Sequence, residues 1–209
     1  PRALSFPAPR EPAFAEGAID RTAKLLVGGR QVRPDGGLSR PVWGPKGALL
    51  GHVGLGNRKD IRNAVEAARA ATGWAKASAW NRAQVLYYIA ENLAARRDEF
   101  AARLRALTGN PGEAEVEAAV LALISAAAWA DRLDGAAKAV PLRGMALALN
   151  DPLGVVGVIC PDEAPLLGLV ALVAPLIAMG NTCVAAPSQA LPLAAPHLAQ
   201  VLDPSDVPA

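Results

Sequence analysis

The stretch of sequence that decides the fold runs from residue 152 to residue 186. It begins with PLGVVGVICPDEAP at residues 152–165 and ends with GNTCVAA at residues 180–186. Residues 154–160 form a β-branched run that is too short for a helix, and they predict a buried strand. The uncharged segment 165–179 predicts a helix that begins on a proline, and residues 182–185 predict a second buried strand. A strand, a helix and another strand in this order are the opening of a parallel α/β sheet.

The sequence that follows predicts only partial cover for this unit. A further helix is expected over residues 192–202. Two parallel strands do not make a stable sheet alone, because both faces and both edges need partners. We therefore expect the chain to stop within a fold or to borrow strands from elsewhere. The apolar run 164–179 is shorter than the roughly 20 residues of a membrane span, and Pro175 interrupts it, so a buried helix is preferred.

Three helices are expected on the N-terminal side of the first strand. Apolar residues recur at helical spacing in segments 60–73, 81–107 and 113–133. Asn57 or Asp60 can cap the first of these helices. A Thr-Gly-Asn-Pro-Gly sequence ends the second, because glycine and proline stop a helix.

The N-terminal quarter of the chain alternates short apolar runs with turn sequences. Residues 25–27, 31–32 and 49–53 predict strands of a small antiparallel segment. Residues 1–22 are rich in proline and alanine with little periodicity, and we interpret them as a linker or surface arm. Residues 23–209 then form one partial domain.

Composition excludes several classes of function. With 21 basic and 19 acidic residues, a net charge of +2 does not suit a nucleic-acid-binding surface. Cys160 and Cys183 each lie in an apolar run, which is typical of reduced core cysteines in a cytoplasmic protein. His52 and His197 are too far apart in sequence to suggest a metal cluster. The chain starts at Pro1 without a signal peptide, and both ends look cut.

Five short strings, in order along the chain, resemble one family. They are the helix at residues 57–71, the helix that contains Arg82, LTGNP at 107–111, PLGVVGVI at 152–159, and AP with AMGNT within 174–182. Together they resemble the aldehyde dehydrogenase family, from about residue 25 to residue 209. The resemblance implies an α/β fold: the first part of a Rossmann-like domain, with an opening β segment, three helices, part of the oligomerisation ribbon and the start of a parallel sheet.

Two positions depart from the family pattern. The family usually has PWNFP after the first sheet strand, where the Asn amide donates to the oxyanion, and this chain has PDEAP with Glu163 at that place. An ionised carboxylate cannot donate a hydrogen bond, and it would repel developing negative charge. The family's second strand usually ends in Lys-Pro, whose lysine holds the cofactor ribose, and here Ala186 precedes Pro187.

The resemblance also places the family's remaining site beyond this chain. The glycine motif for the cofactor phosphates, the general-base glutamate and the nucleophilic cysteine all lie past residue 209. We therefore expect no catalytic residue, no cofactor-binding residue and no metal ligand in this chain. We expect no bound cofactor either, and NAD in the parent enzyme.

Other candidate chemistry is weaker. The carboxylates of Asp162 and Glu163 should raise the pKa of the nearby Cys160 thiol, which argues against a nucleophile. We interpret those two carboxylates as caps that interact with the dipole of the following helix, rather than as an acid/base pair. The glycines at 51–56 follow no βαβ pattern, so a phosphate cradle there is disfavoured.

The preferred function is a non-catalytic structural or assembly module of a larger NAD-dependent aldehyde dehydrogenase. It resembles the degenerate second domain of tandem members of the family. The resemblance puts residues 145–149 in the oligomerisation ribbon, where an edge strand would pair with another module. We expect an active aldehyde dehydrogenase domain as partner, in cis or in trans, a homo-oligomer, and neither nucleic acid nor membrane. Two alternatives stay open: a segment of an active enzyme and a stand-alone nucleotide-binding module.

Overall fold

A computed structural model describes residues 22–133, 135–141, 143–205 and 207 of the chain. The predicted arm at residues 1–22 thus lies outside the described residues except for its last position. Two antiparallel hairpins open the described part: β1 Leu25–Val27 with β2 Arg30–Val32, and β3 Ser39–Trp43 with β4 Leu49–Gly54.

Helices and two further pairs of strands follow in order. They are α1 Arg58–Ala70, α2 Thr72–Lys76, α3 Ala79–Ala95, α4 Arg97–Thr108, α5 Glu113–Ala130, β5 Ala136–Ala139, β6 Met145–Ala148, β7 Val155–Ile159, α6 Pro165–Ala178, β8 Thr182–Ala186, α7 Ala194–Leu202 and the 3₁₀ turn η1 Asp203–Ser205. In the described part of the chain, no helix has the length and apolarity that crossing a membrane requires.

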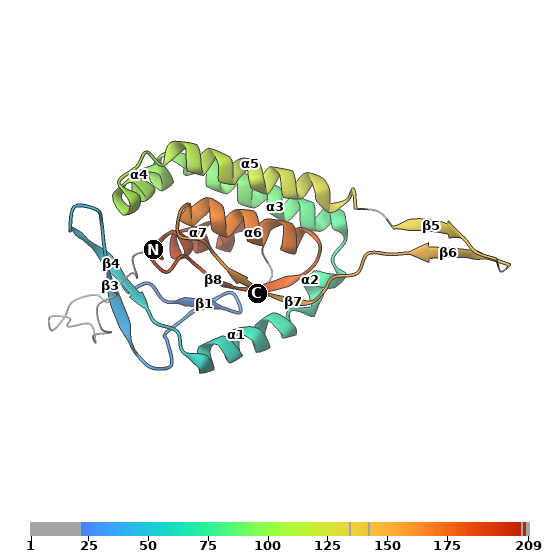
Figure 1. The fold of residues 1–209 in the computed structure, drawn as a ribbon, viewed down its shortest axis with the longest axis horizontal. Helices are drawn as coiled ribbons and strands as arrows, with labels where there is room; N and C mark the ends of the chain where they lie inside the picture. The colour runs from blue at the N-terminus through green and yellow to red at the C-terminus, as the bar shows by residue number, and fades with distance from the viewer. Residues whose placement is uncertain (1–21, 134, 142, 206, 208–209) are drawn as a thin grey trace.

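The strand pair predicted from the sequence is present. Strands β7 and β8 run parallel, with Val155 opposite Thr182 and Ile159 opposite Ala186. Figure 1 shows α1 on one side of this pair and α6 on the other, with α3 and α5 forming a further layer beyond α6. The observed layers are those of the first part of an α/β domain of the Rossmann-like type.

The hydrophobic core lies in the helical layer. Helices α3, α5 and α6 contact one another extensively. Leu86, Phe100, Val116 and Leu166 are each at most 2% exposed. Burial of such side chains stabilises a fold by about 1.5–3 kcal/mol each, so the buried side chains of this layer stabilise the chain.

The C-terminal end of α6 is held by two donors from the N-terminal helices. Trp74 Nε1 donates to the carbonyl oxygen of Ile177 at 2.9 Å, and Arg82 Nε donates to that of Ala178 at 2.9 Å. The last carbonyls of a helix have no partner within the helix, so these donors satisfy them. Arg82 thus has a structural role at the point where the sequence resembles the family.

The Gly-Asn pair after α6 fixes the start of both strands. Gly180 has a φ of 82°, a left-handed conformation that glycine adopts without strain. The Asn181 side chain accepts from the backbone N–H of Gly154 at 3.1 Å and donates to the carbonyl of Leu176 at 3.1 Å. One buried amide therefore links the end of α6 to the residue before β7.

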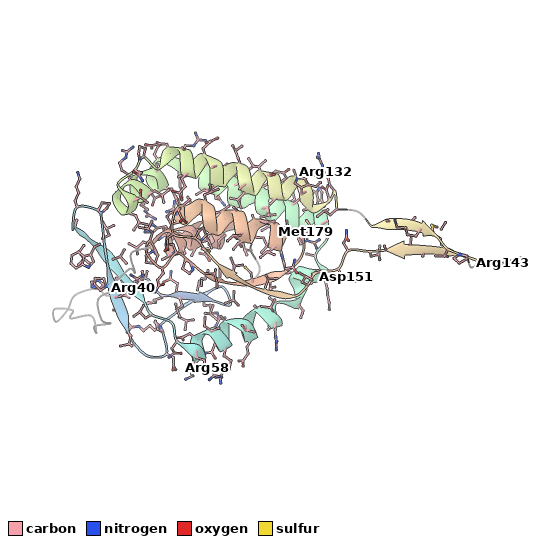
Figure 2. All side chains as sticks on the ribbon, viewed as in Figure 1. Arg40, Arg58, Arg132, Arg143, Asp151 and Met179 are labelled. Carbon is pink, nitrogen blue, oxygen red and sulfur yellow. The ribbon has the colours of Figure 1, made fainter. Side chains whose placement is uncertain are left out.

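Strands β5 and β6 form a ribbon that projects from the body of the molecule (Figure 1). Figure 2 places Arg143 at its tip and Arg132 and Asp151 near its base. Leu147 lies opposite Ala137, and Met145 lies opposite Ala139, so these side chains share one face. We call the side chains of Met145, Leu147 and Leu149, which are 65–74% exposed, the ribbon face.

The prediction of one continuous helix over 81–107 is wrong. The helix breaks at Arg96, whose φ of −106° and ψ of 20° are not helical, and α4 begins at the next residue. The Arg96 N–H bonds to the Leu93 carbonyl, and its guanidinium pairs with Glu99 at 2.7 Å. The bend lets α4 contact α5 and α7 while Phe100 is buried.

Other boundaries were predicted with errors of a few residues. The expected cap of the first helix is confirmed as a capping box between Asn57 and Asp60, although the helix ends at Ala70 rather than 73. The third helix ends at Ala130 rather than 133. The prediction missed β3, β5 and α2, because their sequences SRPVW, AAKA and TGWAK carry proline, alanine or glycine rather than a clear period.

Candidate functional site

The loops after β7 and β8 start side by side at the carboxyl ends of the two strands. Ile159 lies opposite Ala186, and the Cys160 N–H donates to the Ala186 carbonyl at 2.9 Å. Open parallel sheets bind ligands outside the carboxyl ends of their strands. The candidate site therefore consists of residues 160–164 and 186–191, which we call the strand-end loops.

Asp162 joins the two strand-end loops. Its Oδ1 accepts a hydrogen bond from Ser188 Oγ at 2.6 Å and one from the Ala190 N–H at 3.1 Å. Ser188 is 1% exposed, and its Oγ in turn accepts from the Leu191 N–H at 2.9 Å. The Ser188 hydroxyl, and then the backbone N–H groups of Ala190 and Gln189, hold the pKa of Asp162 below its ordinary value despite some desolvation.

Arg40 holds the second strand-end loop from another direction. Its Nη2 donates to the carbonyl oxygen of Gln189, and the residue is only 9% exposed. Burial lowers the pKa of its guanidinium. Figure 2 shows Arg40 on the β3–β4 hairpin, at the end of the molecule opposite the ribbon. The loop after β8 is thus fixed between a cation from β3 and a carboxylate from the loop after β7.

The two positions that depart from the family pattern lie on these loops and are exposed. Glu163 and Ala186 are both solvent-accessible at the same edge. Ala186 brings a methyl group where a lysine would bring a cation. An ionised Glu163 has acceptors but no donor for an oxyanion. That these two side chains replace the family's contacts with an oxyanion and a cofactor ribose stays a prediction from the sequence resemblance.

The prediction that Asp162 and Glu163 cap α6 by hydrogen bonds is wrong. The residue before α6 is Ala164, which has no side-chain oxygen, and the cap comes from α5 instead. Glu115 Oε1 accepts from the N–H groups of Leu166 at 2.8 Å and Leu167 at 3.1 Å. The free N–H groups of the first turn are therefore satisfied by a carboxylate 51 residues away in the chain.

The two cysteines are free thiols, as the sequence predicts. Cys160 is buried at 7% exposure, and this burial raises its pKa. The direction agrees with the sequence argument, but the cause is desolvation rather than the neighbouring carboxylates. Burial also raises the pKa of Cys183. A thiol with a raised pKa is a poor nucleophile, so neither cysteine suits covalent catalysis.

The two histidines lie on different elements of the fold. His52 lies on β4 and His197 on α7. Burial, and then the charge of Arg103, lower the pKa of His197 to about 4, so its imidazole is neutral at pH 7. Across the described ranges, no group of three or more histidine, cysteine, aspartate or glutamate residues is placed to hold a metal ion. The glycines at 51–56 lie on β4 and the turn after it.

Sequence reasoning missed Ser188, Glu115 and Arg40. The Asp162–Ser188 contact spans 26 residues, and the Arg40 contact with Gln189 spans 149. No local motif signals such contacts. The one available signal is that polar residues after two adjacent parallel strands must lie at the same edge.

Comparison with known proteins agrees with this geometry. The model of the aldehyde dehydrogenase family matches residues 37–209. Aldehyde dehydrogenase family 2 member B4, mitochondrial, of Arabidopsis thaliana is 32% identical over 182 residues, which cover 82% of this chain and 34% of that protein. The 2-hydroxymuconic semialdehyde dehydrogenase of Pseudomonas sp. strain CF600 is 35% identical over 176 residues, 78% of this chain and 36% of that protein.

A solved structure gives the same result in three dimensions. The structure of 3,6-anhydro-L-galactose dehydrogenase in complex with NAP superposes with a TM-score of 0.86 at 26% identity, and covers 90% of this chain and 41% of that one. The chain thus spans 34–36% of the length of these two curated relatives. Since the family model matches most of its residues, the chain belongs to the aldehyde dehydrogenase family.

Proposed function

We propose that this chain is a non-catalytic structural module that assembles with an active, NAD-dependent aldehyde dehydrogenase domain. The observation that carries the proposal is the chemistry of the strand-end loops: Glu163 and Ala186 stand where the family pattern has an oxyanion donor and a ribose-binding lysine. Catalysis needs donors aimed at the developing negative charge. A domain that has exchanged both contacts keeps the family's shape but not this part of its chemistry.

The ribbon supports the assembly half of the proposal. Met145, Leu147 and Leu149 are 70%, 65% and 74% exposed on a projecting two-stranded ribbon. An isolated hairpin is marginally stable in water, and exposed strand edges invite pairing with another chain. We propose that this ribbon pairs with a second copy of the chain or with the active domain, in a reducing, cytoplasmic compartment that suits its two free thiols.

The proposed module holds no cofactor of its own. NAD carries ribose hydroxyls and a diphosphate, which require donors and cations. At the strand ends, Ala186 supplies neither, and the Asp162 carboxylate occupies the Ser188 hydroxyl and the Ala190 amide. We therefore expect isothermal titration with NAD to give no binding in the micromolar range. Micromolar affinity would favour the alternative of a nucleotide-binding module.

A second candidate is a segment of an active aldehyde dehydrogenase. Its support is the similarity to the semialdehyde dehydrogenase of Pseudomonas and to a dehydrogenase solved with NAP. An active segment would form NADH from an aldehyde once it is complemented by the remaining part of a family domain. The structural module would not gain activity in that way, because Glu163 and Ala186 would still be in place.

The test is a mixing experiment on the full chain. We expect it to co-elute from a size-exclusion column with the active aldehyde dehydrogenase of its own organism, and to form no NADH from aldehydes by itself. Leu147→Asp, which places a charge on the ribbon face, should abolish co-elution. Lys138→Ala, on the other face of the ribbon, is the matched control and should not. Elution as a monomer that ignores the enzyme would contradict the proposal.

A further inference from the structure

The turn after β8 has the features of an anion-binding cradle. Two hydrogen bonds converge on one carboxylate oxygen, from the Ser188 hydroxyl at 2.6 Å and from the Ala190 N–H at 3.1 Å, and the neighbouring Gln189 N–H also lowers the pKa of this carboxyl. Successive backbone N–H groups in a tight turn form concave sites that bind phosphate and other anions. Here the oxygen that sits in the cradle belongs to Asp162 of the same chain.

The direction of the Ser188 proton is fixed by its neighbours. Ser188 Oγ accepts from the Leu191 N–H at 2.9 Å, so its own proton is free to point at Asp162. At 1% exposure this hydroxyl is removed from water. Without an acceptor in the place of Asp162, this buried hydroxyl would lose its hydrogen-bond partner, which is unfavourable.

A buried cation supports the same turn from behind. Arg40 is 9% exposed and donates to the Gln189 carbonyl, one residue from each of the two other donors. Donation to that carbonyl polarises the peptide group between Gln189 and Ala190. The Ala190 N–H then becomes a stronger donor, which favours an anion next to it. The cradle therefore offers a hydroxyl and backbone donors to an anion, and a guanidinium holds the turn through the Gln189 carbonyl; hydroxyl and backbone N–H groups are donors that phosphate oxygens accept from.

We propose that Asp162 is a built-in anion that fills this cradle and keeps the strand-end loops closed to external phosphate groups. The carboxylate takes the position of a ligand oxygen and ties the loop after β7 to the loop after β8. This inference rests on the proposed non-catalytic function and explains how the chain orders this edge with its own side chain. The chemical class that the cradle would accept, once vacated, is a phosphate or phosphate monoester.

The test is a titration of the ¹⁵N-labelled full chain with inorganic phosphate at constant ionic strength, followed by the amide signals of residues 189–191. In Asp162→Ala we expect saturable shifts at these amides and binding at least tenfold tighter than in the wild type. Glu163→Ala, the adjacent exposed carboxylate, is the matched control and should behave as the wild type. In the Asp162→Ala background, Ser188→Ala should remove the gain.

Two results would overturn the inference. One is a folded Asp162→Ala variant that shows no phosphate response, and the other is a wild type that binds phosphate as tightly as the variant. If Asp162→Ala does not fold, Asp162→Asn keeps an acceptor but loses the charge. Asp162→Asn should then bind phosphate more tightly than the wild type, and equal responses of this variant and the wild type would count against the proposal.

The outcome is separable from that of the proposed function. Failure of phosphate to bind leaves co-elution with the active enzyme unaffected, because the ribbon lies at the opposite end of the molecule from Arg40 (Figure 2). Loss of co-elution with an intact phosphate response would reject the assembly role alone.

Discussion

The helical layer buries its apolar side chains, whereas the ribbon exposes them. In α3 and α6, Leu86 and Leu166 are fully buried, whereas on the ribbon Met145 and Leu147 are 70% and 65% exposed. A folded chain rarely leaves large apolar residues grouped on a projecting element unless another surface covers them. The difference teaches that the helical layer is stabilised within this chain, while the ribbon is suited to contact with another one.

The β7–β8 pair lies between these two extremes. Val158 is buried at 7% exposure, yet Ile159 is 86% and Leu153 is 88% exposed. Within the described residues, this sheet has two strands, so each has one edge without a strand partner. Helices cover its faces, but its edges and ends are consistent with a fold that continues beyond these strands.

The largest effect is expected in the helical layer. Leu86→Ala should lower the free energy of unfolding by about 2–5 kcal/mol, because it leaves a cavity in a fully buried site. Leu147→Ala on the ribbon face is the matched control, and it should change stability by no more than about 0.5 kcal/mol. Urea denaturation measures both. Similar losses in the two variants would remove the distinction between the regions.

A smaller effect is expected at the cap of α6. Glu115→Ala should cost about 1–3 kcal/mol, because it leaves the N–H groups of Leu166 and Leu167 without their acceptor in a partly buried place. Glu113→Ala, which removes an exposed ion pair with Arg105, should cost no more than about 1 kcal/mol. Thermal unfolding of both variants would show whether the long-range cap contributes more than the surface pair.

The hydrogen bonds of Asp162 with Ser188 and Ala190 should make the free energy of unfolding depend on pH under acidic conditions. The folded-state pKa of Asp162 is lowered, so its contribution is present above the unfolded-state value of about 3.9 and is lost as pH falls through the folded-state pKa. Asp162→Asn should therefore reduce the loss of stability on acidification below about pH 4. At neutral pH it should cost about 1 kcal/mol. The free energy of unfolding is measured by denaturation at a series of pH values. If it falls with pH equally in the variant and the wild type, the role of the carboxylate is contradicted.

The smallest effect at neutral pH is expected at His197. Its folded-state pKa of about 4 lies below the ordinary 6.5, so folding favours the neutral imidazole. Its contribution is complete above pH 6.5 and is lost as pH falls toward 4, since the unfolded chain then binds a proton that the folded chain does not. His197→Gln should reduce the change in the free energy of unfolding between pH 6.5 and 4 and leave the free energy at pH 8 nearly unchanged. A variant that is as sensitive to pH 4–6.5 as the wild type would show that other groups dominate there.

The sequence predicted the part of the fold that rests on local patterns. The β-branched run before Cys160, the Pro165 helix and the Asn57 cap all have signatures within a few residues, and each is present. The break at Arg96 was not predictable, because the apolar period continues through it and the packing of α4 decides it. The Asp162–Ser188 hydrogen bond and the Glu115 cap of α6 join residues that are 26 and 51 positions apart, and local patterns do not contain such contacts.

The measurement that tests the account most directly is sedimentation velocity of the full chain, wild type beside Leu147→Asp. The account predicts that the wild type sediments as an assembly, alone or mixed with the active aldehyde dehydrogenase of its organism, and that Leu147→Asp sediments as a monomer that still unfolds cooperatively in urea. Both results are expected because the helical layer is stable alone, whereas the ribbon needs a partner. A wild type that is monomeric at every concentration, both alone and mixed with the active aldehyde dehydrogenase of its organism, would contradict it, and so would a Leu147→Asp chain that stays assembled.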